Sequence, residues 1–216
     1  MNAVIFDLDG TMIDNMMVHH RAWQSKLAEY GIEMSVEEVQ SRIHGVNIEI
    51  LEREFPGQFT VDERIQIAKE KEETYRQIYA SELVLLSGLP ALLHDLKATN
   101  ILMSVGSAAP PENVNFVLNN LDLWHYFVAV RHSDDVERGK PDPQVYDILL
   151  DEMDVKPSEC LIFEDSRTGA IAASRAGCKV IIVTTTHQPA EFSDIPNVVN
   201  FISDFTEISV QQIQSL

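Results

Sequence analysis

The first apolar segment of the chain constrains the fold more than any other stretch. Residues 3–6 (AVIF) are apolar and lead directly into the sequence DLDGT at positions 7–11. Such a run is typical of a buried parallel strand, and open α/β sheets bind ligands at the carboxyl ends of these strands. Because side chains at i and i+2 point the same way in an extended chain, we expect Asp7 and Asp9 to face one small site while Leu8 turns into the core. Two carboxylates that close favour a bound cation.

Two patterns divide the rest of the sequence. Residues 15–82 contain successive segments with helical spacing and no convincing strand. From about residue 87, helical and strand-like segments alternate, which predicts an α/β fold with a parallel sheet and helices on both faces.

The predicted elements follow from caps, stops and apolar spacing. Ser35 opens a capping box, Asn47 is predicted to cap the next helix, and Ile65 is predicted to be a packing position of a long charged helix. Strands are predicted at residues 3–6, 101–105, 127–131, 160–163, 180–184 and 198–202. Helices are predicted from residue 16 to the stop at Gly31, from residue 35, at residues 47–55, 62–79, 89–97, 111–119, 143–153 and 167–176, and at the C-terminus.

Charge and composition argue against several classes of partner. The chain has 216 residues, 45% of them hydrophobic, and a net charge of −18. Nothing suggests a basic stripe, so we expect no nucleic-acid partner. No apolar run approaches the roughly 20 residues of a membrane span, and no signal peptide is evident, so we expect no membrane partner. Cys160 and Cys178 suit a reducing cytoplasm and are predicted to fill core space. The expected protein is cytoplasmic and a monomer or weak dimer.

Three later segments carry further polar candidates, two of them directly after strand-like runs. Ser107 comes after residues 101–106, Lys140 lies between Gly139 and a proline, and Glu164 and Asp165 follow residues 160–163. A hydroxyl at a strand end can bind a phosphate oxygen, and acids there can join Asp7 in holding a hard cation. No Cys/His cluster suggests zinc. Phosphoryl transfer through a covalent aspartyl-phosphate needs a nucleophilic carboxylate, an acid/base, a cation and phosphate donors, and the sequence offers a candidate for each.

These motifs carry a family resemblance. The string DLDGT at residues 7–11 resembles the nucleophile motif of the haloacid dehalogenase superfamily, and residues 12–14 (MID), His19 and residues 21–23 (RAW) resemble its β-phosphoglucomutase-like subgroup of phosphatases and mutases. Ser107, the sequence GKPDP at residues 139–143, EDSRTG at 164–169 and AASRAG at 172–177 extend the match over essentially the whole chain. Two alanines after Ser107 depart from the serines often found there.

The resemblance implies an architecture and a set of roles. It implies a Rossmann-like parallel-sheet core formed by residues 1–14 and 84–216, with an inserted helical cap domain formed by residues 15–83. Asp7 matches the nucleophile, and Asp9 matches the general acid/base, whose backbone carbonyl also binds the metal. Ser107 would bind a phosphate oxygen and Lys140 would neutralise charge. The implied cofactor is Mg²⁺, held by Asp7, Asp9, Asp165 and, directly or through water, Glu164.

Four further residues are candidates for substrate selection or cap closure. His19 has helical spacing with Trp23 and Leu27, so a partly buried helix residue is an equal alternative to a histidine that positions Asp9. Asp14 and Asn15 are candidates for reporting cap closure to the catalytic loop. Lys71 is a candidate for contacting a sugar or second phosphate, although a solvated lysine is the favoured interpretation in so charged a helix.

One departure bears on the reaction. In the mutase, the segment like residues 44–48 carries an arginine that holds the second phosphate of the substrate, and Ile48 stands here instead. Losing a charge-assisted pair costs on the order of 1.5–3 kcal/mol, and Arg21, Arg42 and Arg53 do not match that position. The favoured function is therefore a Mg²⁺-dependent phosphatase of a small phosphorylated metabolite, with sugar phosphates as the leading class.

Other functions stay open at this point. The first alternative is a β-phosphoglucomutase-type phosphosugar mutase, which differs only in the acceptor of the phosphoryl group. A second alternative is a non-catalytic module that binds a phosphometabolite. A haloalkanoate dehalogenase is disfavoured by Asp9 and Asp165, because those enzymes need no Mg²⁺ and usually lack the second acid.

Overall fold

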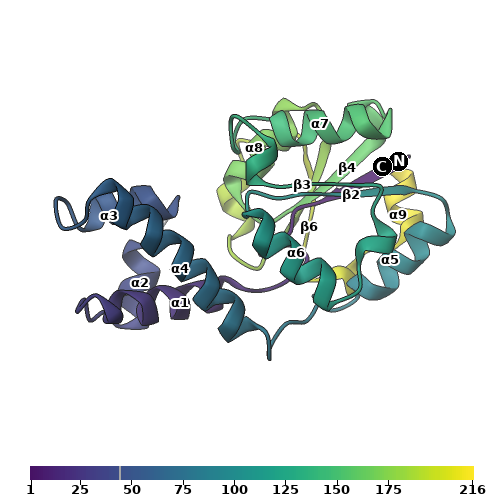
Figure 1. Cartoon of the computed structure of the whole chain (residues 1–216). Coiled ribbons are helices and arrows are strands. Elements are labelled where there is room, and N and C mark those ends of the chain that lie inside the picture. Colours follow the sequence, from purple (N-terminus) through teal and green to yellow (C-terminus); the bar gives the residue numbers. More distant parts are fainter. Residues whose placement is uncertain (44) are drawn as a thin grey trace. The chain divides into compact units, whose positions relative to one another are not determined.

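The computed structural model describes residues 1–43 and 45–216, which form two compact units (Figure 1). One unit comprises Met1–Asp14 and Val84–Leu216, and the other is the segment Asn15–Leu83 inserted between them. Within the first unit, the N–H of Leu86 donates to the carbonyl of Met12 at 2.9 Å. The chain therefore leaves this unit and returns to it at neighbouring points.

A six-stranded sheet forms the centre of the first unit, with the strand order β3-β2-β1-β4-β5-β6. All neighbouring strands are parallel, which confirms the predicted fold class. The strands are β1 (Ala3–Phe6), β2 (Leu102–Gly106), β3 (Ala129–Arg131), β4 (Cys160–Glu164), β5 (Lys179–Val183) and β6 (Val198–Ile202). Because β1 lies between β2 and β4, the chain segments after these three strands emerge at one edge of the sheet.

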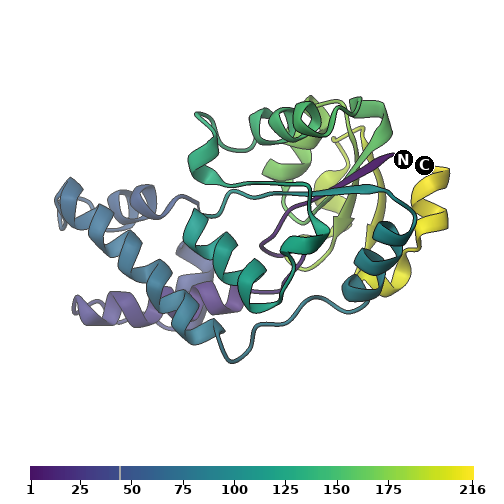
Figure 2. The same ribbon diagram turned by 45° about the vertical axis from the view of Figure 1, so that its right-hand side comes forward.

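Helices cover both faces of this sheet. Figures 1 and 2 show α7 and α8 on one face and α5, α6 and α9 on the other. The bounds of these helices are α5 (Leu89–Ala98), α6 (Pro111–Asn120), α7 (Gln144–Met153), α8 (Arg167–Arg175) and α9 (Val210–Ser215). The predicted strand over residues 127–131 is shorter in the structure, because a 3-10 turn at Trp124–Tyr126 occupies the approach to β3.

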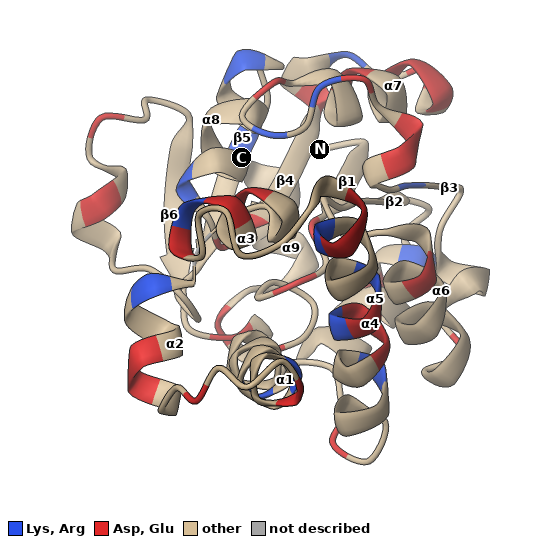
Figure 3. Cartoon of the chain, turned by 60° about the vertical axis from the view of Figure 1, so that its left-hand side comes forward, with Lys and Arg blue, Asp and Glu red and all other residues tan. Residues whose placement is uncertain are grey.

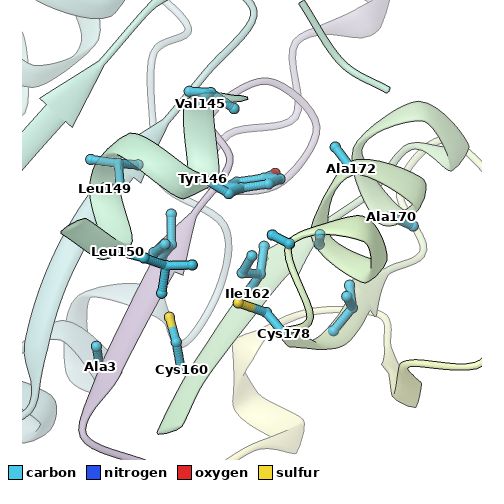
Figure 4. Close-up of a cluster of buried hydrophobic side chains, with 14 of the residues drawn as sticks. Ala3, Val145, Tyr146, Leu149, Leu150, Cys160, Ile162, Ala170, Ala172 and Cys178 are labelled. Carbon is cyan, nitrogen blue, oxygen red and sulfur yellow. The ribbon is translucent and has the colours of Figure 1, made fainter. Parts of the chain in front are cut away.

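The core divides between the two faces of the sheet. Ile5 and Ile162 pack with α7 and α8 in one buried cluster (Figure 4), whereas Phe6 stacks on Phe163 at 5.3 Å on the opposite face. This alternation follows from the period of two along a strand. Cys160 and Cys178 are fully buried free thiols in the first cluster, so the prediction that they fill core space is confirmed.

Over the described residues of the inserted unit, 15–43 and 45–83, the helices are α1 (Met16–Glu29), α2 (Val36–Arg42), α3 (Asn47–Glu54) and α4 (Val61–Tyr79). The capping box at Ser35 is present, and a second one at Thr60 opens α4. Acidic and basic positions are interspersed along α4 (Figure 3). Over the described residues 1–43 and 45–216, no helix combines the length and the apolar character needed to cross a membrane.

Two predictions for this unit are wrong. Asn47 does not cap α3: Val46 is the N-cap residue, and the Asn47 amide instead donates to Oε1 of Glu72 at 2.6 Å. Ile65 is 49% exposed, because the packed face of α4 carries Ile67, Lys71 and Tyr75 at positions four apart.

Candidate active site

The end of β1 positions Asp7. Its N–H continues the sheet ladder by donating to the carbonyl of Phe163 at 3.0 Å, and the residue is 6% exposed. The ends of the two neighbouring strands bring Ser107 and Glu164 to the same edge of the sheet. Leu8 is fully buried, as predicted, so the chain turns between the two aspartates with its apolar side chain inward.

Lys140 connects these strand ends. Its Nζ atom donates to Oδ1 of Asp7 at 2.6 Å, to Oε1 of Glu164 at 2.6 Å and to the carbonyl of Gly106 at 3.0 Å. Burial alone would lower the pKa of Lys140, but the carboxylates of Asp7 and Glu164 more than offset this effect. The pKa therefore lies well above its usual value, and the side chain is a buried ammonium.

Both carboxylate oxygens of Glu164 are engaged. Oε1 accepts from Lys140 and from the hydroxyl of Tyr146 at 2.9 Å, and Oε2 accepts from the N–H groups of Asp165 and Ser166 and from the Ser166 hydroxyl. Burial would raise the pKa of Glu164, but Lys140 and these donors hold it below its usual value. A Cβ atom at Gly169 would lie within 2.3 Å of this carboxylate, so only glycine fits there.

Three buried carboxylates form a cluster that could hold a metal ion. Asp7, Glu164 and Asp165 each offer an oxygen, and these oxygens lie within 4.8 Å of one another. Burial and the neighbouring carboxylates raise the pKa of Asp7 well above its usual value and that of Asp165 to about 7. One lysine leaves this group with excess negative charge, which a hard divalent cation with oxygen ligands would relieve. The donor set therefore fits such a cation.

The loop after β1 carries Asp9 close to this cluster. Gly10 has φ +77° and its N–H donates to the carbonyl of Ile13 at 2.8 Å, which tightens the loop. A side chain at position 10 would collide with Asp165, because a Cβ there would lie 2.2 Å from its Oδ2 atom. The charge of Asp9 contributes to the raised pKa of Asp165. Asp9 is thus part of the electrostatic surroundings of the cluster.

Ser107 is held at the end of β2. Its N–H donates to the carbonyl of Arg131 at 3.0 Å, and its Oγ atom accepts from the N–H of Ala109 at 3.0 Å. A second hydroxyl on β2, that of Ser104, is fully buried within the strand and donates to Sδ of Met153 at 3.2 Å.

Three of the four predicted substrate-selecting residues lie in the inserted unit, and Asp14 is the last residue before it. Nζ of Lys71 lies 2.8 Å from Nδ1 of His19, whose ring stacks on Tyr75 at 4.0 Å. The amide of Asn15 donates to the Tyr75 hydroxyl at 2.7 Å. Burial and the Lys71 ammonium lower the pKa of His19 to about 3, so its ring is neutral.

The favoured interpretation of Lys71 as a solvated lysine is wrong. Lys71 is 2% exposed and lies over the rings of Trp23 and Tyr75, at 5.7 and 5.9 Å from their centroids. Glu72 pairs with its ammonium at 2.8 Å. The many charged residues around position 71 suggested an exposed lysine. Only a narrow face of α4 is packed, and Lys71 lies on that face.

Comparison with known proteins identifies the family. The family model described as haloacid dehalogenase-like hydrolase matches residues 4–183. This chain belongs to that family. The hydrolase is 31% identical over 188 residues to a phosphorylated carbohydrates phosphatase of Thermotoga maritima, which covers 84% of each chain. It is 30% identical over 215 residues to a β-phosphoglucomutase of Bacillus subtilis, which covers 95% of this chain and 92% of the relative.

A solved structure extends this similarity to the whole fold. The crystal structure of a haloacid dehalogenase hydrolase of family IA, variant 3, from Entamoeba histolytica matches with a TM-score of 0.90 and 25% identity, covering 100% of this chain and 98% of that one. The resemblance deduced from the sequence motifs, and the type of enzyme it implied, are therefore confirmed.

Sequence reasoning missed the contact between Tyr146 and the acidic cluster. The sequence indicates Tyr146 only as part of the predicted helix 143–153, yet its hydroxyl donates to Glu164. Its place within the apolar sequence VYDILL at residues 145–150 was the available signal, because a buried tyrosine usually requires a hydrogen-bond partner for its hydroxyl.

Proposed function

We propose that this hydrolase is a Mg²⁺-dependent phosphatase that acts on a small phosphorylated metabolite, with sugar phosphates as the leading class. The observation that carries the proposal is the Lys140 ammonium between Asp7 and Glu164 at the carboxyl edge of the sheet, next to Asp165. This arrangement suits a carboxylate that attacks an anion. The similarity to a phosphatase of phosphorylated carbohydrates supports the substrate class.

The proposed chemistry has two steps on Asp7. A carboxylate oxygen of Asp7 bonds to phosphorus while the bond from phosphorus to the alcohol oxygen of the substrate breaks, and Asp9 gives that oxygen its proton. Asp9 then takes a proton from a water molecule that attacks the phosphorus, which releases inorganic phosphate and restores Asp7. Lys140 balances charge in both steps. Ser107 donates its hydroxyl hydrogen to a phosphate oxygen, since its Oγ already accepts from Ala109.

A divalent cation completes the proposed site. Asp7 and Asp165 would hold Mg²⁺ through their carboxylates, together with the backbone carbonyl of Asp9, and the ion would supply positive charge beside the transferred phosphoryl group. Glu164 belongs to the same acidic cluster, but its oxygens already accept five hydrogen bonds. This saturation favours Glu164 as the residue that holds Lys140 rather than as a direct ligand.

We also propose that residues 15–83 act as a cap domain that selects the substrate. The segment is inserted directly after the loop that carries Asp7 and Asp9. Its group of buried Asn15 and Lys71 and half-buried His19 has polar atoms suited to a hydroxylated ligand. The proposed catalytic domain is then Met1–Asp14 with Val84–Leu216.

The charges of the inserted unit favour hydrolysis over mutase chemistry. Ile48 cannot pair with a second phosphate. The three arginines considered as substitutes each pair with a glutamate: Arg21 with Glu82 at 2.6 Å, Arg42 with Glu54 at 3.1 Å and Arg53 with Glu54 at 2.9 Å. A phosphosugar mutase remains the second candidate, because a β-phosphoglucomutase is among the relatives.

One assay separates these functions. The purified protein is incubated with Mg²⁺ and a panel of sugar phosphates that includes β-glucose 1-phosphate with a trace of the 1,6-bisphosphate. Free phosphate and isomerised sugar phosphate are both measured. Phosphate release without isomerisation supports the phosphatase. Rapid formation of glucose 6-phosphate with little free phosphate supports the mutase instead, and no turnover of any substrate refutes both.

A further inference from the structure

Tyr146 lies directly behind the proposed catalytic lysine. The residue belongs to α7 and is fully buried in the cluster that α7 and α8 form with the sheet. Figure 4 shows its side chain extending from α7 in the direction of α8. Most of this cluster is apolar, so the phenol brings a polar atom into surroundings where an unsatisfied hydroxyl would be costly.

Two contacts link Tyr146 to the site. Its hydroxyl donates to Oε1 of Glu164 at 2.9 Å, and the Lys140 ammonium lies 4.9 Å from the centroid of its ring. One side chain thus provides both a donor to the acid that holds Lys140 and an aromatic face beside the ammonium.

The hydrogen bonds around Oε1 of Glu164 indicate what the contacts of Tyr146 do. Oε1 of Glu164 takes two donors, Lys140 and Tyr146, while Nζ of Lys140 has Asp7 and the Gly106 carbonyl as its other acceptors. The Tyr146 hydroxyl, as a second donor to Oε1, fixes the orientation of the Glu164 carboxylate. It also weakens the attraction of this carboxylate for the Lys140 ammonium. Without the phenol hydroxyl, Glu164 would draw Lys140 away from Asp7.

We propose that Tyr146 is a positioning residue that keeps the Lys140 ammonium on Asp7 by sharing Oε1 of Glu164. The inference rests on the proposed function, in which Lys140 balances charge during phosphoryl transfer. In this role Tyr146 contacts neither the substrate nor the nucleophile Asp7. It positions Lys140, which does.

The test compares Tyr146→Phe with the wild-type enzyme in two measurements. The phenylalanine keeps the ring and removes only the hydroxyl. Tyr126→Phe, at a tyrosine of the same unit outside the site, is the control for losing a phenol hydroxyl. Crystal structures give the distance from Nζ of Lys140 to Oδ1 of Asp7, and steady-state hydrolysis of p-nitrophenyl phosphate with Mg²⁺ gives kcat and KM separately.

In Y146F the distance between Nζ and Oδ1 is expected to exceed the hydrogen-bonding range, starting from 2.6 Å in the parent chain. We expect kcat to fall about 10- to 100-fold, as is typical when a supporting partner of a site is removed. KM should change by less than about twofold, because the interaction that is lost acts mainly in the transition state. Y126F should match the wild type in both measurements.

A Y146F structure with the Lys140–Asp7 bond intact overturns the positioning role, whatever the kinetics. Kinetics can also overturn it when the wild type is active. The positioning role is wrong if the kcat of Y146F stays within about twofold of the wild-type value, or if only KM changes. A wild type that hydrolyses no phosphate ester refutes the proposed function instead, and the crystallographic distance still decides whether Tyr146 places Lys140.

Discussion

Nζ of Lys140 lies 2.6 Å from Oδ1 of Asp7, although 133 positions separate the two residues in the sequence. The pair is buried, and Glu164 and Asp165 add two further carboxylates beside it. The site thus holds more negative than positive charge in surroundings that penalise both. This imbalance makes the site sensitive to substitution, to pH and to divalent cations, and each sensitivity can be measured.

Asp7→Asn is expected to abolish hydrolysis by at least about a thousandfold, because an amide cannot form the aspartyl-phosphate. The free energy of unfolding without metal should not fall, since the pKa of Asp7 is raised and its ionised form is unfavourable in the fold. Phosphate release and thermal melting check both points. Asp95→Asn, at an exposed position of α5, is the control, and an active D7N enzyme would contradict the assignment of the nucleophile.

Lys140→Met is expected to destabilise the protein as well as inactivate it. Removing the ammonium leaves Asp7 and Glu164 buried without a counter-charge, which costs about 3–5 kcal/mol for a broken buried pair. Chemical denaturation at pH 8 without metal measures this loss. Lys69→Met, at an exposed position of α4, should change stability by less than about 0.5 kcal/mol. Equal effects at the two positions would show that Lys140 does not offset the acidic cluster.

The contribution of Asp165 to stability without metal is expected to fall as pH rises from about 4 to about 7. The pKa of Asp165 is raised to about 7 from its usual 3.8, so this carboxyl group binds its proton more tightly in the folded chain than in the unfolded chain, and its contribution to the free energy of unfolding decreases with pH. The Tm of the wild type should therefore fall relative to that of Asp165→Asn as pH rises. Differential scanning calorimetry from pH 5 to pH 8 is the measurement.

Mg²⁺ is expected to reverse that loss. At a concentration of 100 times Kd, a ligand of the folded state adds about 2.7 kcal/mol, or roughly 5–10 °C in Tm for a chain of this size. The increase should be larger at pH 8 than at pH 5, because protons compete with the cation for Asp7 and Asp165. An increase that does not depend on pH would place the cation elsewhere.

Gly169→Ala is expected to disturb the site through packing alone. The added methyl group would lie within 2.3 Å of the Glu164 carboxylate, and overpacking of this kind costs about 1–3 kcal/mol. Activity should fall with stability, since Glu164 holds Lys140. Gly139→Ala is the matched control, because a Cβ there meets no atom within 4 Å. Urea denaturation measures the unfolding midpoint of both variants. Equal midpoints would contradict the expectation.

The ring of His19 is expected to stay neutral throughout the physiological range. Its pKa is lowered to about 3 by burial and by Lys71, so its NMR resonances should not titrate between pH 5 and pH 8. Because the unfolded histidine protonates near pH 6.5, this residue costs stability as pH falls below that value. Titration of His19 near pH 6.5 would show that the contact with Lys71 does not persist in solution.

The sequence was sufficient to predict the parallel sheet and the polar residues that follow its strands. Apolar runs such as residues 3–6 and 160–163 are buried on both faces, and such strands carry a strong local signal. The parallel order then brings Asp7, Ser107 and Asp165 to one edge of the sheet, as expected for residues that follow its strands. The resemblance to the family motifs was needed to single out Ser107 among the residues that follow strands.

What the sequence could not provide depends on contacts across the fold. The burial of Lys71 depends on which stripe of α4 packs inward, and local charge gives the opposite impression. The hydrogen bond from Tyr146 to Glu164 joins a helix to a strand that lies 18 positions away. Asn47 resembles a helix cap locally, but it is the first residue of α3, after the N-cap residue Val46, and its amide bonds to Glu72.

The hydrogen bond between Leu86 and Met12 joins the two chain segments at which the chain leaves the first unit and returns to it. A domain whose exit and re-entry are joined in this way can host inserts of different length, because the ends it must bridge stay fixed. If residues 15–83 select the substrate as proposed, the chemistry of the strand ends and the choice of substrate can change separately. Exchange of residues 15–83 for the equivalent segment of a relative would in that case alter specificity and leave the proposed reacting groups in place.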